Sequence, residues 1–411
     1  MKTIVLKFGG TSVGSIERIS AVAKIIREAK KEAFPIVVVS AMSGETDRLI
    51  NLANETHENP PKREFDALIS TGEKVSAALL AMSLNKIDVP SKSYSAAQIS
   101  MRTTSQFSKA KIINIDFTRI EEAIQNNFVP VITGFQGITD DGDVTTLGRG
   151  GSDTTAVALA AAMKSLRCDI YTDVDGIYTT DPNVVPEAKK LDRITMEEML
   201  ELSGQGAKVM QVRAVEFANK YKVPVRVLSS FTSGAGTLIS LEEPDMDTME
   251  KAVVSGIAFQ KDQSKFTFQG VKDSPGIASS ILGPIAAEGI EVDVIIQNIS
   301  NDGKTDLTFT VSSTDRNSVE AICKHQLQDL EYDNLLIDNN VGKVSIVGVG
   351  MRTHAGIASR AFQALARASI NISMISTSEI KITLVINVDD VNNAVQVLHA
   401  EFAIEKSLLI W

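Results

Sequence analysis

The second half of the chain repeats itself, and this repeat limits the folds that are open to it. Residues 270–295 align with residues 350–375 at a spacing of 80, which places Gly276 on Gly356 and Ile277 on Ile357. In each copy the pattern of apolar and turn residues predicts a strand, a glycine-containing turn, a helix, two strands and a second helix. The sequence therefore predicts two βαββαβ units of about 70 to 80 residues each.

The first 240 residues have a different pattern, in which short β-branched runs alternate with helical stretches. The predicted strands are Thr3–Lys7, Ile36–Ser40, Val129–Thr133, Asp169–Thr172 and Val223–Val227, and the predicted helices are Glu17–Lys31, Ser152–Ser165 and Met196–Leu202. This alternation is typical of a largely parallel sheet that is covered by helices on both faces. An acidic, proline-containing stretch around Leu241–Met249 predicts a linker between the two halves.

Composition and charge exclude several classes of protein. The 411 residues are 44% hydrophobic and 22% charged, which is typical of a folded chain of two or three domains. A net charge of −10 does not favour nucleic acids, because an acidic chain gains nothing from counterion release. Cys168 and Cys323 form no CxxC pair and predict neither a disulfide framework nor a metal site. The longest apolar stretch, Ala156–Met163, is shorter than the roughly 20 residues that cross a bilayer. The N-terminal apolar run is too short for a signal peptide. We therefore expect a cytoplasmic protein without a membrane segment.

The first candidate site lies where the opening strand ends. Lys7 is followed closely by Gly9 and Gly10. Glycines at a turn from strand to helix allow backbone N–H groups to approach a phosphate, and the lysine adds a positive charge. Gly9 and Gly14 have the spacing of a Walker A loop, but Ser15 stands where that loop has its lysine, so a Walker A site is excluded. A tight turn without a ligand is the alternative.

The second candidate is the glycine-rich segment 145–154, Thr-Thr-Leu-Gly-Arg-Gly-Gly-Ser-Asp-Thr, in which three glycines surround Arg149. A loop of this composition suits a small anion, and the guanidinium offers two parallel N–H donors to a carboxylate. The alternatives are a surface salt bridge for Arg149 and helix capping for Ser152 or Asp153.

The third candidate, residues 171–182, places carboxylates and hydroxyls directly after a predicted strand, as Tyr-Thr-Asp-Val-Asp-Gly-Ile-Tyr-Thr-Thr-Asp-Pro. Such groups suit a nucleotide, its ribose or Mg²⁺ in phosphoryl transfer, and a turn with Asp-Gly and Asp-Pro is the alternative. Two weaker candidates are Ser70–Glu73 and Val39–Thr46, either of which alone could be a helix cap.

Together and in this order, the segments resemble the aspartate kinases of the amino acid kinase superfamily. The resemblance covers nearly the whole chain, including KFGGTSV at 7–13, TTLGRGGSDTT at 145–155 and GAKV at 206–209, and the two repeat units resemble ACT domains. It implies an α/β fold: an amino acid kinase-like αβα sandwich with a mainly parallel sheet, followed by two βαββαβ ACT domains. The expected boundaries are 1–241 for the catalytic domain, 242–262 for a linker, and 263–342 and 343–411 for the ACT domains.

The resemblance also implies roles for individual residues, with Lys7, Arg149 and Asp153 as the catalytic residues. Aspartate would be bound by Thr46, Glu73, Phe135, Arg149, Ser152 and Asp153, with Arg149 on its α-carboxylate and Glu73 facing its ammonium. The nucleotide would be bound by Lys7, Phe8, Gly9, Gly10, Ser40, Thr172, Asp173, Tyr178, Asp181 and Lys208. Effector amino acids would contact Asp273, Ser274, Gly276, Gln297, Asn298, Thr377, Ser378 and Glu379. No residue is expected to bind a metal directly.

The implied activity is ATP-dependent phosphorylation of the β-carboxylate of L-aspartate, the first step of lysine, threonine and methionine biosynthesis. The cofactors would be ATP and Mg²⁺, the latter bound mainly through the phosphates. A carboxylate is already ionised at pH 7, so the reaction needs no histidine base. Expected partners are lysine and threonine as effectors, a second copy of the chain through the ACT domains, and a shorter regulatory subunit from an internal start.

Two other functions remain open at this stage. A sister kinase acting on glutamate, N-acetylglutamate or a nucleotide shares the fold. A non-catalytic amino-acid sensor would keep a dead kinase domain and would have lost Lys7 or Arg149, which are both present. One position departs from the family: Asn183 follows the Asp-Pro pair where arginine is usual, and Lys208 is the cation that could replace that arginine.

Overall fold

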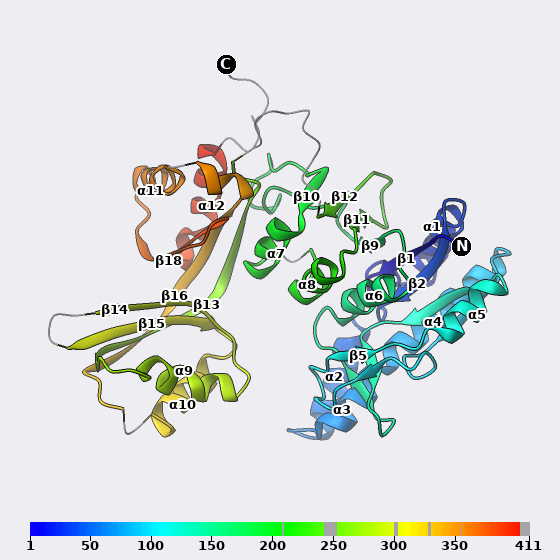
Figure 1. The fold of residues 1–411 in the computed structure, drawn as a ribbon, viewed down its shortest axis with the longest axis horizontal. Helices are drawn as coiled ribbons and strands as arrows, with labels where there is room; N and C mark the ends of the chain where they lie inside the picture. The colour runs from blue at the N-terminus through cyan, green and yellow to red at the C-terminus, as the bar shows by residue number, and fades with distance from the viewer. Residues whose placement is uncertain (208, 242–252, 300–302, 328–329, 355, 403–411) are drawn as a thin grey trace, which may run out of the picture. The chain divides into compact units, whose positions relative to one another are not determined.

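The protein was analysed as a computed structural model, which describes residues 1–207, 209–241, 253–299, 303–327, 330–354 and 356–402. The chain divides into two compact units (Figure 1). Unit 1 consists of Met1–Tyr178, Lys190–Gly204 and Lys208–Thr248, and unit 2 of Thr179–Lys189, Gln205–Ala207 and Met249–Trp411. The segment Thr179–Lys189 therefore leaves unit 1 and belongs to unit 2.

Unit 1 is built on an eight-stranded sheet with the order β10-β12-β11-β9-β1-β2-β6-β3. One continuous run of its strands is parallel: β3 (Ser91–Tyr94), β6 (Val129–Thr133), β2 (Phe34–Val39), β1 (Thr3–Phe8), β9 (Cys168–Thr172) and β11 (Val225–Ser229). Next to β11 the direction reverses at β12 (Thr237–Ser240), which is parallel to β10 (Arg193–Thr195). The predicted mainly parallel sheet is confirmed.

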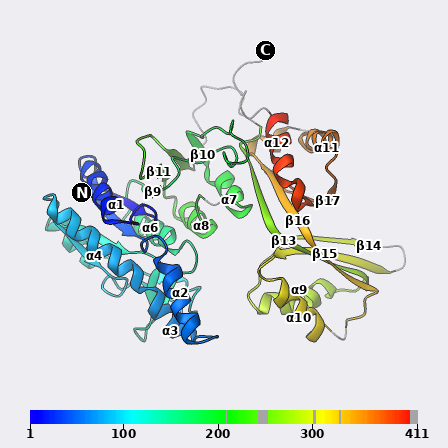
Figure 2. The same cartoon turned by 180° about the vertical axis from the view of Figure 1, so that it is seen from behind.

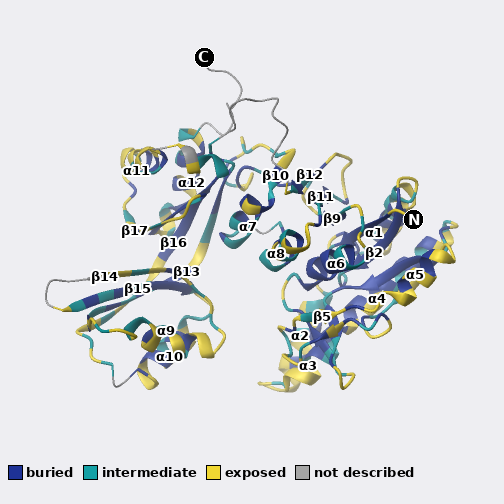
Figure 3. Ribbon diagram, viewed as in Figure 1, coloured by how far each residue is buried: buried dark blue, intermediate teal, exposed yellow. Residues whose placement is uncertain are grey.

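The central strands are buried on both faces, in accord with their predominantly apolar sequences. Every residue of β1 and β2 is buried. Helices α1 (Ile16–Ala29) and α4 (Thr71–Lys86) pack together, and α4 packs against β2, β3 and β6 (Figure 2). Helix α6 (Gly151–Ala162) packs against β1, β2 and β9, and α8 (Val212–Tyr221) packs on α6. Figure 3 shows the buried residues concentrated in the strands between these helices.

The rest of unit 1 lies outside the large sheet, and the sequence predicts only one of its elements, the helix Met196–Leu202, which the structure shows as α7 (Met196–Gly204). The other elements are α2 (Glu45–Thr56), α3 (Lys62–Ile69), α5 (Thr118–Gln125) and a small sheet of β5 (Ile112–Asn114), β4 (Arg102–Thr103), β7 (Gln136–Ile138) and β8 (Val144–Thr146). Strands of two or three residues are too short to show a period in the sequence. The run Lys62–Lys86 is the one described stretch long and apolar enough to cross a membrane, but half of its apolar window is buried in the protein, as in an ordinary core helix.

Unit 2 contains a six-stranded antiparallel sheet that both repeat copies share. Its strands, in order, are β14 (Val292–Ile299), β15 (Lys304–Ser312), β13 (Gly256–Lys272), β16 (Asn334–Val347), β18 (Lys381–Asn387) and β17 (Ile372–Thr377). Its helices are α9 (Ile277–Ala287), α10 (Arg316–His325), α11 (Ile357–Arg367) and α12 (Val391–Glu401), with short 3₁₀ turns at Val349–Thr353 and Val388–Asp390.

The two copies adopt the same local conformation where the sequence repeats. Gly276 and Gly356, which are 80 residues apart, precede α9 and α11 with φ angles of +95° and +94°. The first part of β13, Gly256–Gln260, pairs with Lys343–Val347 of β16, so a strand that precedes the first copy in sequence lies in the sheet of the second. The predicted ACT boundaries stay a prediction, and residues 242–252 of the predicted linker lie outside the described residues.

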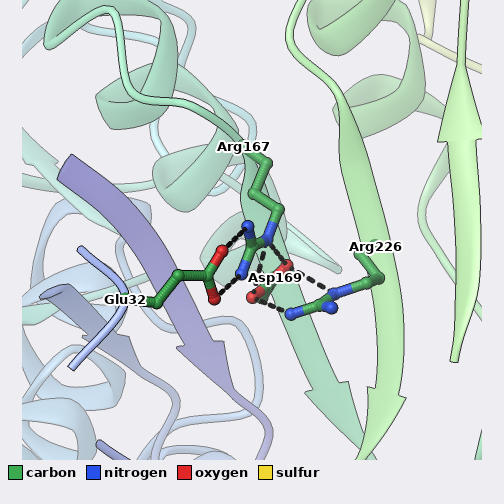
Figure 4. A network of polar contacts seen from close by, with 4 residues as sticks. All are labelled: Glu32, Arg167, Asp169 and Arg226. Carbon is green, nitrogen blue, oxygen red and sulfur yellow. Dashed lines mark hydrogen bonds and ion pairs between the residues drawn. The ribbon is translucent and has the colours of Figure 1, made fainter. Parts of the chain in front are cut away.

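A network of charged residues joins three segments near the amino ends of the parallel strands (Figure 4). Asp169, on β9, has a side chain that is only 1% exposed. Its carboxylate accepts hydrogen bonds from Arg167 Nε at 2.9 Å and from Arg226 Nη2 at 2.7 Å, and Arg167 also donates to Glu32 at 2.7 Å. The network ties β9 to β11 and to the loop before β2.

We predict that Asp169→Asn destabilises unit 1 by about 3–5 kcal/mol, because breaking a buried ion pair leaves the arginine charges without their anion. Denaturant unfolding followed by circular dichroism measures this loss. The matched control is Glu32→Gln, which removes a half-exposed partner of the same network and should cost about 1 kcal/mol or less. Equal effects of the two substitutions would contradict the assignment of Asp169 as the centre of the network.

Candidate active site

Several of the predicted kinase-site residues of unit 1 lie at or just after the carboxyl ends of neighbouring parallel strands. The strands β1, β2, β6 and β9 end at Phe8, Val39, Thr133 and Thr172. Ligands of open α/β sheets bind at such an edge. The residues that follow these strands directly are Gly9, Ser40, Gly134 and Asp173.

Lys7 and Asp153 form a buried ion pair at this edge. Lys7 is 8% exposed and Asp153 7% exposed, and the distance from Lys7 Nζ to Asp153 Oδ1 is 2.6 Å. Asp153 lies in the first turn of α6, whose amino end favours a negative charge. The N-cap of α6 is Gly150, with a φ of +69° and no side-chain capping bond, so the capping alternative for Ser152 and Asp153 is wrong.

Glycines bring the strand ends close together. The N–H of Gly9 donates to the carbonyl of Tyr171 at 3.2 Å, which joins the loop after β1 to β9. A Cβ atom at Gly10 would lie 2.9 Å from the carbonyl oxygen of Ala41, so only glycine fits there without a shift of the backbone. The Phe8 side chain is fully buried and stacks on Tyr171 with 4.7 Å between ring centroids, which leaves only the backbone of Phe8 for a ligand.

Glu73 is a buried carboxylate with one unsatisfied oxygen. It lies in the first turn of α4 and is 3% exposed. Its Oε1 accepts a hydrogen bond from the N–H of Ala41 at 3.1 Å, whereas its buried Oε2 has no partner among the described residues. Burial raises the pKa of Glu73 from 4.5 to about 7, and the Ala41 N–H acts against this rise. A buried polar atom without a partner, combined with a shifted pKa, is typical of a binding site.

Arg149 is presented to solvent by its loop. The side chain is exposed and makes no hydrogen bond or ion pair with another described residue, so the salt-bridge alternative finds no support there. Nearby, Phe135 has a φ of +69° and its carbonyl accepts from the N–H of Leu147 at 2.8 Å, while Ser152 is 6% exposed. Thr46 is partly buried in the first turn of α2.

The predicted nucleotide segment is held by its own side chains. The hydroxyl of Thr172 donates to Asp173 Oδ1 at 3.0 Å, and that of Tyr178 donates to Asp175 Oδ1 at 2.8 Å. The bond to Asp175 raises the pKa of Tyr178. Lys190 Nζ lies 3.3 Å from Asp175 Oδ2. Asp175 lies in this segment, but nothing in the sequence distinguishes it from the other acidic residues there or pairs it with Lys190.

Two predicted nucleotide residues do not belong to the described part of unit 1. Asp181 belongs to unit 2, within the segment Thr179–Lys189. Its Oδ1 accepts from the backbone N–H and side-chain amide of Asn183 at 2.8 and 2.9 Å, so Asn183 closes a turn on Asp181. Lys208 lies outside the described residues.

The predicted effector residues all belong to unit 2. Gln297 and Asn298 are exposed on the edge strand β14, and Thr377 ends β17, the edge strand at the other side of the sheet. In the loop before α9 the N–H of Asp273 donates to the carbonyl of Gly303. After β17 the N–H of Ser378 donates to the carbonyl of Lys381, and Glu379 forms an ion pair with Arg352 at 3.2 Å.

Comparisons with known proteins agree with this fold. The model of the amino acid kinase family matches residues 2–229, and that of an ACT domain matches residues 344–402. The fold and the site thus define a class: an amino acid kinase catalytic region joined to ACT domains.

Curated relatives narrow the class to one family. An aspartokinase of Pseudomonas aeruginosa is 53% identical over 406 residues, which cover 98% of both chains. An aspartokinase of Helicobacter pylori is 48% identical over 98% of this chain and 100% of the relative. The structure of E. coli aspartokinase III in complex with aspartate and ADP superposes with a TM-score of 0.84 at 25% identity, covering 97% of this chain and 99% of that one. The chain belongs to the aspartokinase family and is a kinase.

We predict that kcat/KM for aspartate falls as the pH drops through about 7, because only ionised Glu73 would bind the substrate ammonium well and kcat/KM reports the pKa of the free enzyme. In Glu73→Gln this acid limb should disappear and kcat/KM should stay low. A pH series with saturating ATP measures both effects.

Thermal unfolding of Glu73→Gln provides the control. Because the folded-state pKa of Glu73 is raised from 4.5 to about 7, ionisation of this group destabilises the folded protein as the pH rises through that window. The amide removes this cost, so the variant should not unfold below the wild-type temperature at alkaline pH. Identical pH profiles for wild type and variant would exclude Glu73 from aspartate binding.

Proposed function

We propose that this aspartokinase transfers the γ-phosphoryl of ATP to the β-carboxylate of L-aspartate and yields 4-phospho-L-aspartate. The observation that carries the proposal is the buried Lys7–Asp153 pair at the carboxyl edge of the parallel sheet, next to the glycines that follow β1. This reaction would be the first step of lysine, threonine and methionine biosynthesis, in the cytoplasm.

Charge and geometry support a role for each of these residues. Lys7 would offset the charge on the phosphoryl in transfer, and Asp153 would hold the ammonium of Lys7 at the end of β1. The free Oε2 of Glu73 would receive the ammonium of aspartate, and the exposed guanidinium of Arg149 its α-carboxylate. No base is needed, since the attacking carboxylate is ionised at pH 7.

The residues at this edge suit a nucleotide and its metal. The close approach of Gly10 to Ala41 keeps side chains out of the loop, which leaves its backbone open to phosphates. Thr172 is the last residue of β9, Asp173 and Tyr178 come after it in the chain, and all three would contact the nucleotide. The described residues contain no group of three or more His, Cys, Asp or Glu side chains that could hold a metal ion, so Mg²⁺ would be bound mainly through the phosphates, where it neutralises their charge.

An assay with hydroxylamine tests the activity. With ATP, Mg²⁺ and aspartate, the enzyme should produce aspartyl hydroxamate, because hydroxylamine traps an acyl phosphate. Lys7→Ala should lower the turnover of the folded enzyme by about a hundredfold or more, as expected for the loss of a main charge-stabilising group. It should also lower the stability, because Asp153 is left without its buried partner, so turnover is compared per folded enzyme. Product with glutamate alone would favour a sister kinase, and no product with any acid would favour a non-catalytic sensor.

We also propose that the ACT pair binds lysine and threonine and inhibits the kinase. The equivalent positions in the two copies carry different residues: Gln297 and Asn298 in one, Thr377 and Ser378 in the other. E. coli aspartokinase III, solved with lysine and aspartate in a T-state, superposes with a TM-score of 0.74 at 27% identity over 98% of this chain and 100% of that one. Self-association through the ACT domains and pairing with a shorter regulatory subunit belong to the same proposal.

We predict that Gln297→Ala and Thr377→Ala resist inhibition and keep the uninhibited rate, because inhibition is a coupling free energy of roughly 1–3 kcal/mol that requires effector binding. Initial rates with lysine, threonine and their mixture measure this. A wild-type enzyme that ignores all three at millimolar concentrations would leave the repeat with a purely architectural role.

A further inference from the structure

A buried carboxylate holds the backbone that leads to Arg149. Asp66, on α3, is fully buried and makes no ion pair with a described residue. It accepts four hydrogen bonds: its Oδ2 from the N–H groups of Ser108 and Thr146, at 2.8 and 2.7 Å, and its Oδ1 from their hydroxyls, at 3.1 and 2.9 Å. A buried charge is costly unless it is fully hydrogen-bonded, and here two segments supply every donor, through Ser108, in a loop, and Thr146, the last residue of β8.

A guanidinium holds the same two segments from another helix. Arg213, on α8, is partly buried and donates to the carbonyls of Leu147 at 2.8 Å and Ala110 at 2.7 Å. Burial lowers the pKa of Arg213, which means that keeping this guanidinium charged at this position costs the folded protein free energy. Its two acceptors are neutral carbonyls, which a shorter polar side chain would not reach together.

Asp66 and Arg213 bind complementary backbone groups of the same two segments. Asp66 accepts hydrogen bonds from the N–H and hydroxyl groups of Ser108 and Thr146, and Arg213 donates to the carbonyls of the nearby Ala110 and Leu147. The segments also bond to each other, from the N–H of Ala110 to the carbonyl of Thr146 at 3.0 Å. The backbone is thus fixed up to two residues before Arg149.

Gly148, which follows Leu147, is also restricted in its backbone conformation. Gly148 has a φ of +79°, and a Cβ atom there would lie 3.0 Å from the carbonyl oxygen of Ser108. Arg149 follows directly, and its exposed side chain finds no described partner that would orient it. The position of the guanidinium therefore depends on the backbone that carries it.

We propose that Asp66 and Arg213 are positioning residues, which place Arg149 for the carboxylate of the substrate and thereby determine the affinity for aspartate. The proposal rests on the role proposed above for Arg149. A catalytic or binding group must be held by its supporting shell, and a displacement of about 1 Å by a distant substitution can cost about a hundredfold. Loss of either support should thus raise the KM for aspartate more than the KM for ATP.

Asp66 offers a matched pair of substitutions. In Asp66→Ala the two backbone N–H groups lose their acceptor, and the KM for aspartate should rise about ten- to a hundredfold. In Asp66→Asn the amide oxygen can still accept from both N–H groups, and the amide nitrogen can face the two hydroxyls, which rotate to accept. Asp66→Asn should therefore keep the KM for aspartate within about threefold of wild type.

Arg213 provides a second pair that tests the proposal even if Asp66→Ala does not fold. Arg213→Met keeps the packing of the aliphatic stem and removes both donors, so the KM for aspartate should rise. Arg213→Lys keeps a single donor group and should have an intermediate effect. Asp169→Asn, at the other end of the strands, is the stability control: it should lower the unfolding temperature without a selective change in the KM for aspartate.

Arg149→Lys, measured in the same series, separates this inference from the function on which it rests. A raised KM for aspartate in Arg149→Lys, Asp66→Ala and Arg213→Met, with recovery in Asp66→Asn, supports the positioning role. Suppose that Arg149→Lys raises the KM for aspartate, but Arg213→Met changes the KM for aspartate and the KM for ATP equally or changes neither of them. Asp66 and Arg213 then only stabilise the fold, and the inference is overturned. An unchanged KM for aspartate in Arg149→Lys overturns the role of Arg149 and the inference together.

Discussion

The ion pair between Lys7 and Asp153 is the interaction on which the kinase region depends. It joins the central strand β1 to the first turn of α6, and both residues are buried. Two charges are stable in such a place only together, because either one alone would be an uncompensated buried charge. The pair therefore fixes a cation at the carboxyl end of a parallel strand, and the glycines after β1 keep the space around it free of side chains.

Buried carboxylates at the two edges of the sheet differ in how completely they are hydrogen-bonded. At the amino edge, both oxygens of Asp169 are satisfied by arginines, which stabilises the fold. At the carboxyl edge, Glu73 keeps a buried oxygen without a described partner, and burial raises its pKa to about 7. An unsatisfied buried oxygen costs free energy, and proteins retain such groups mainly at functional sites, where a ligand completes the hydrogen bonds.

In unit 2 the two copies of the repeat share strands of one sheet. The long strands β13 and β16 pass through the sheets of both copies, so neither copy is a separate segment of the chain. The segment Thr179–Lys189 also belongs to this unit: Val185 lies in the hydrophobic core of the second copy, and Gln396 donates to the carbonyl of Val184 at 2.9 Å. The predicted nucleotide motif is thus continuous in sequence but divided between two units.

The sequence by itself determined the elements whose pattern is local. The strands Thr3–Phe8 and Val129–Thr133 are predominantly apolar, β-branched runs, and the paired glycines 80 residues apart predict two helices that start in the same way. Only the tertiary structure decided which distant groups meet. Asp66 meets Thr146 across 80 residues, Arg213 meets Leu147 across 66, and Glu73 loses solvent through the packing of α4. Hydrogen bonds and burial depend on distance in space, and a single sequence contains no signal for pairs so far apart along the chain.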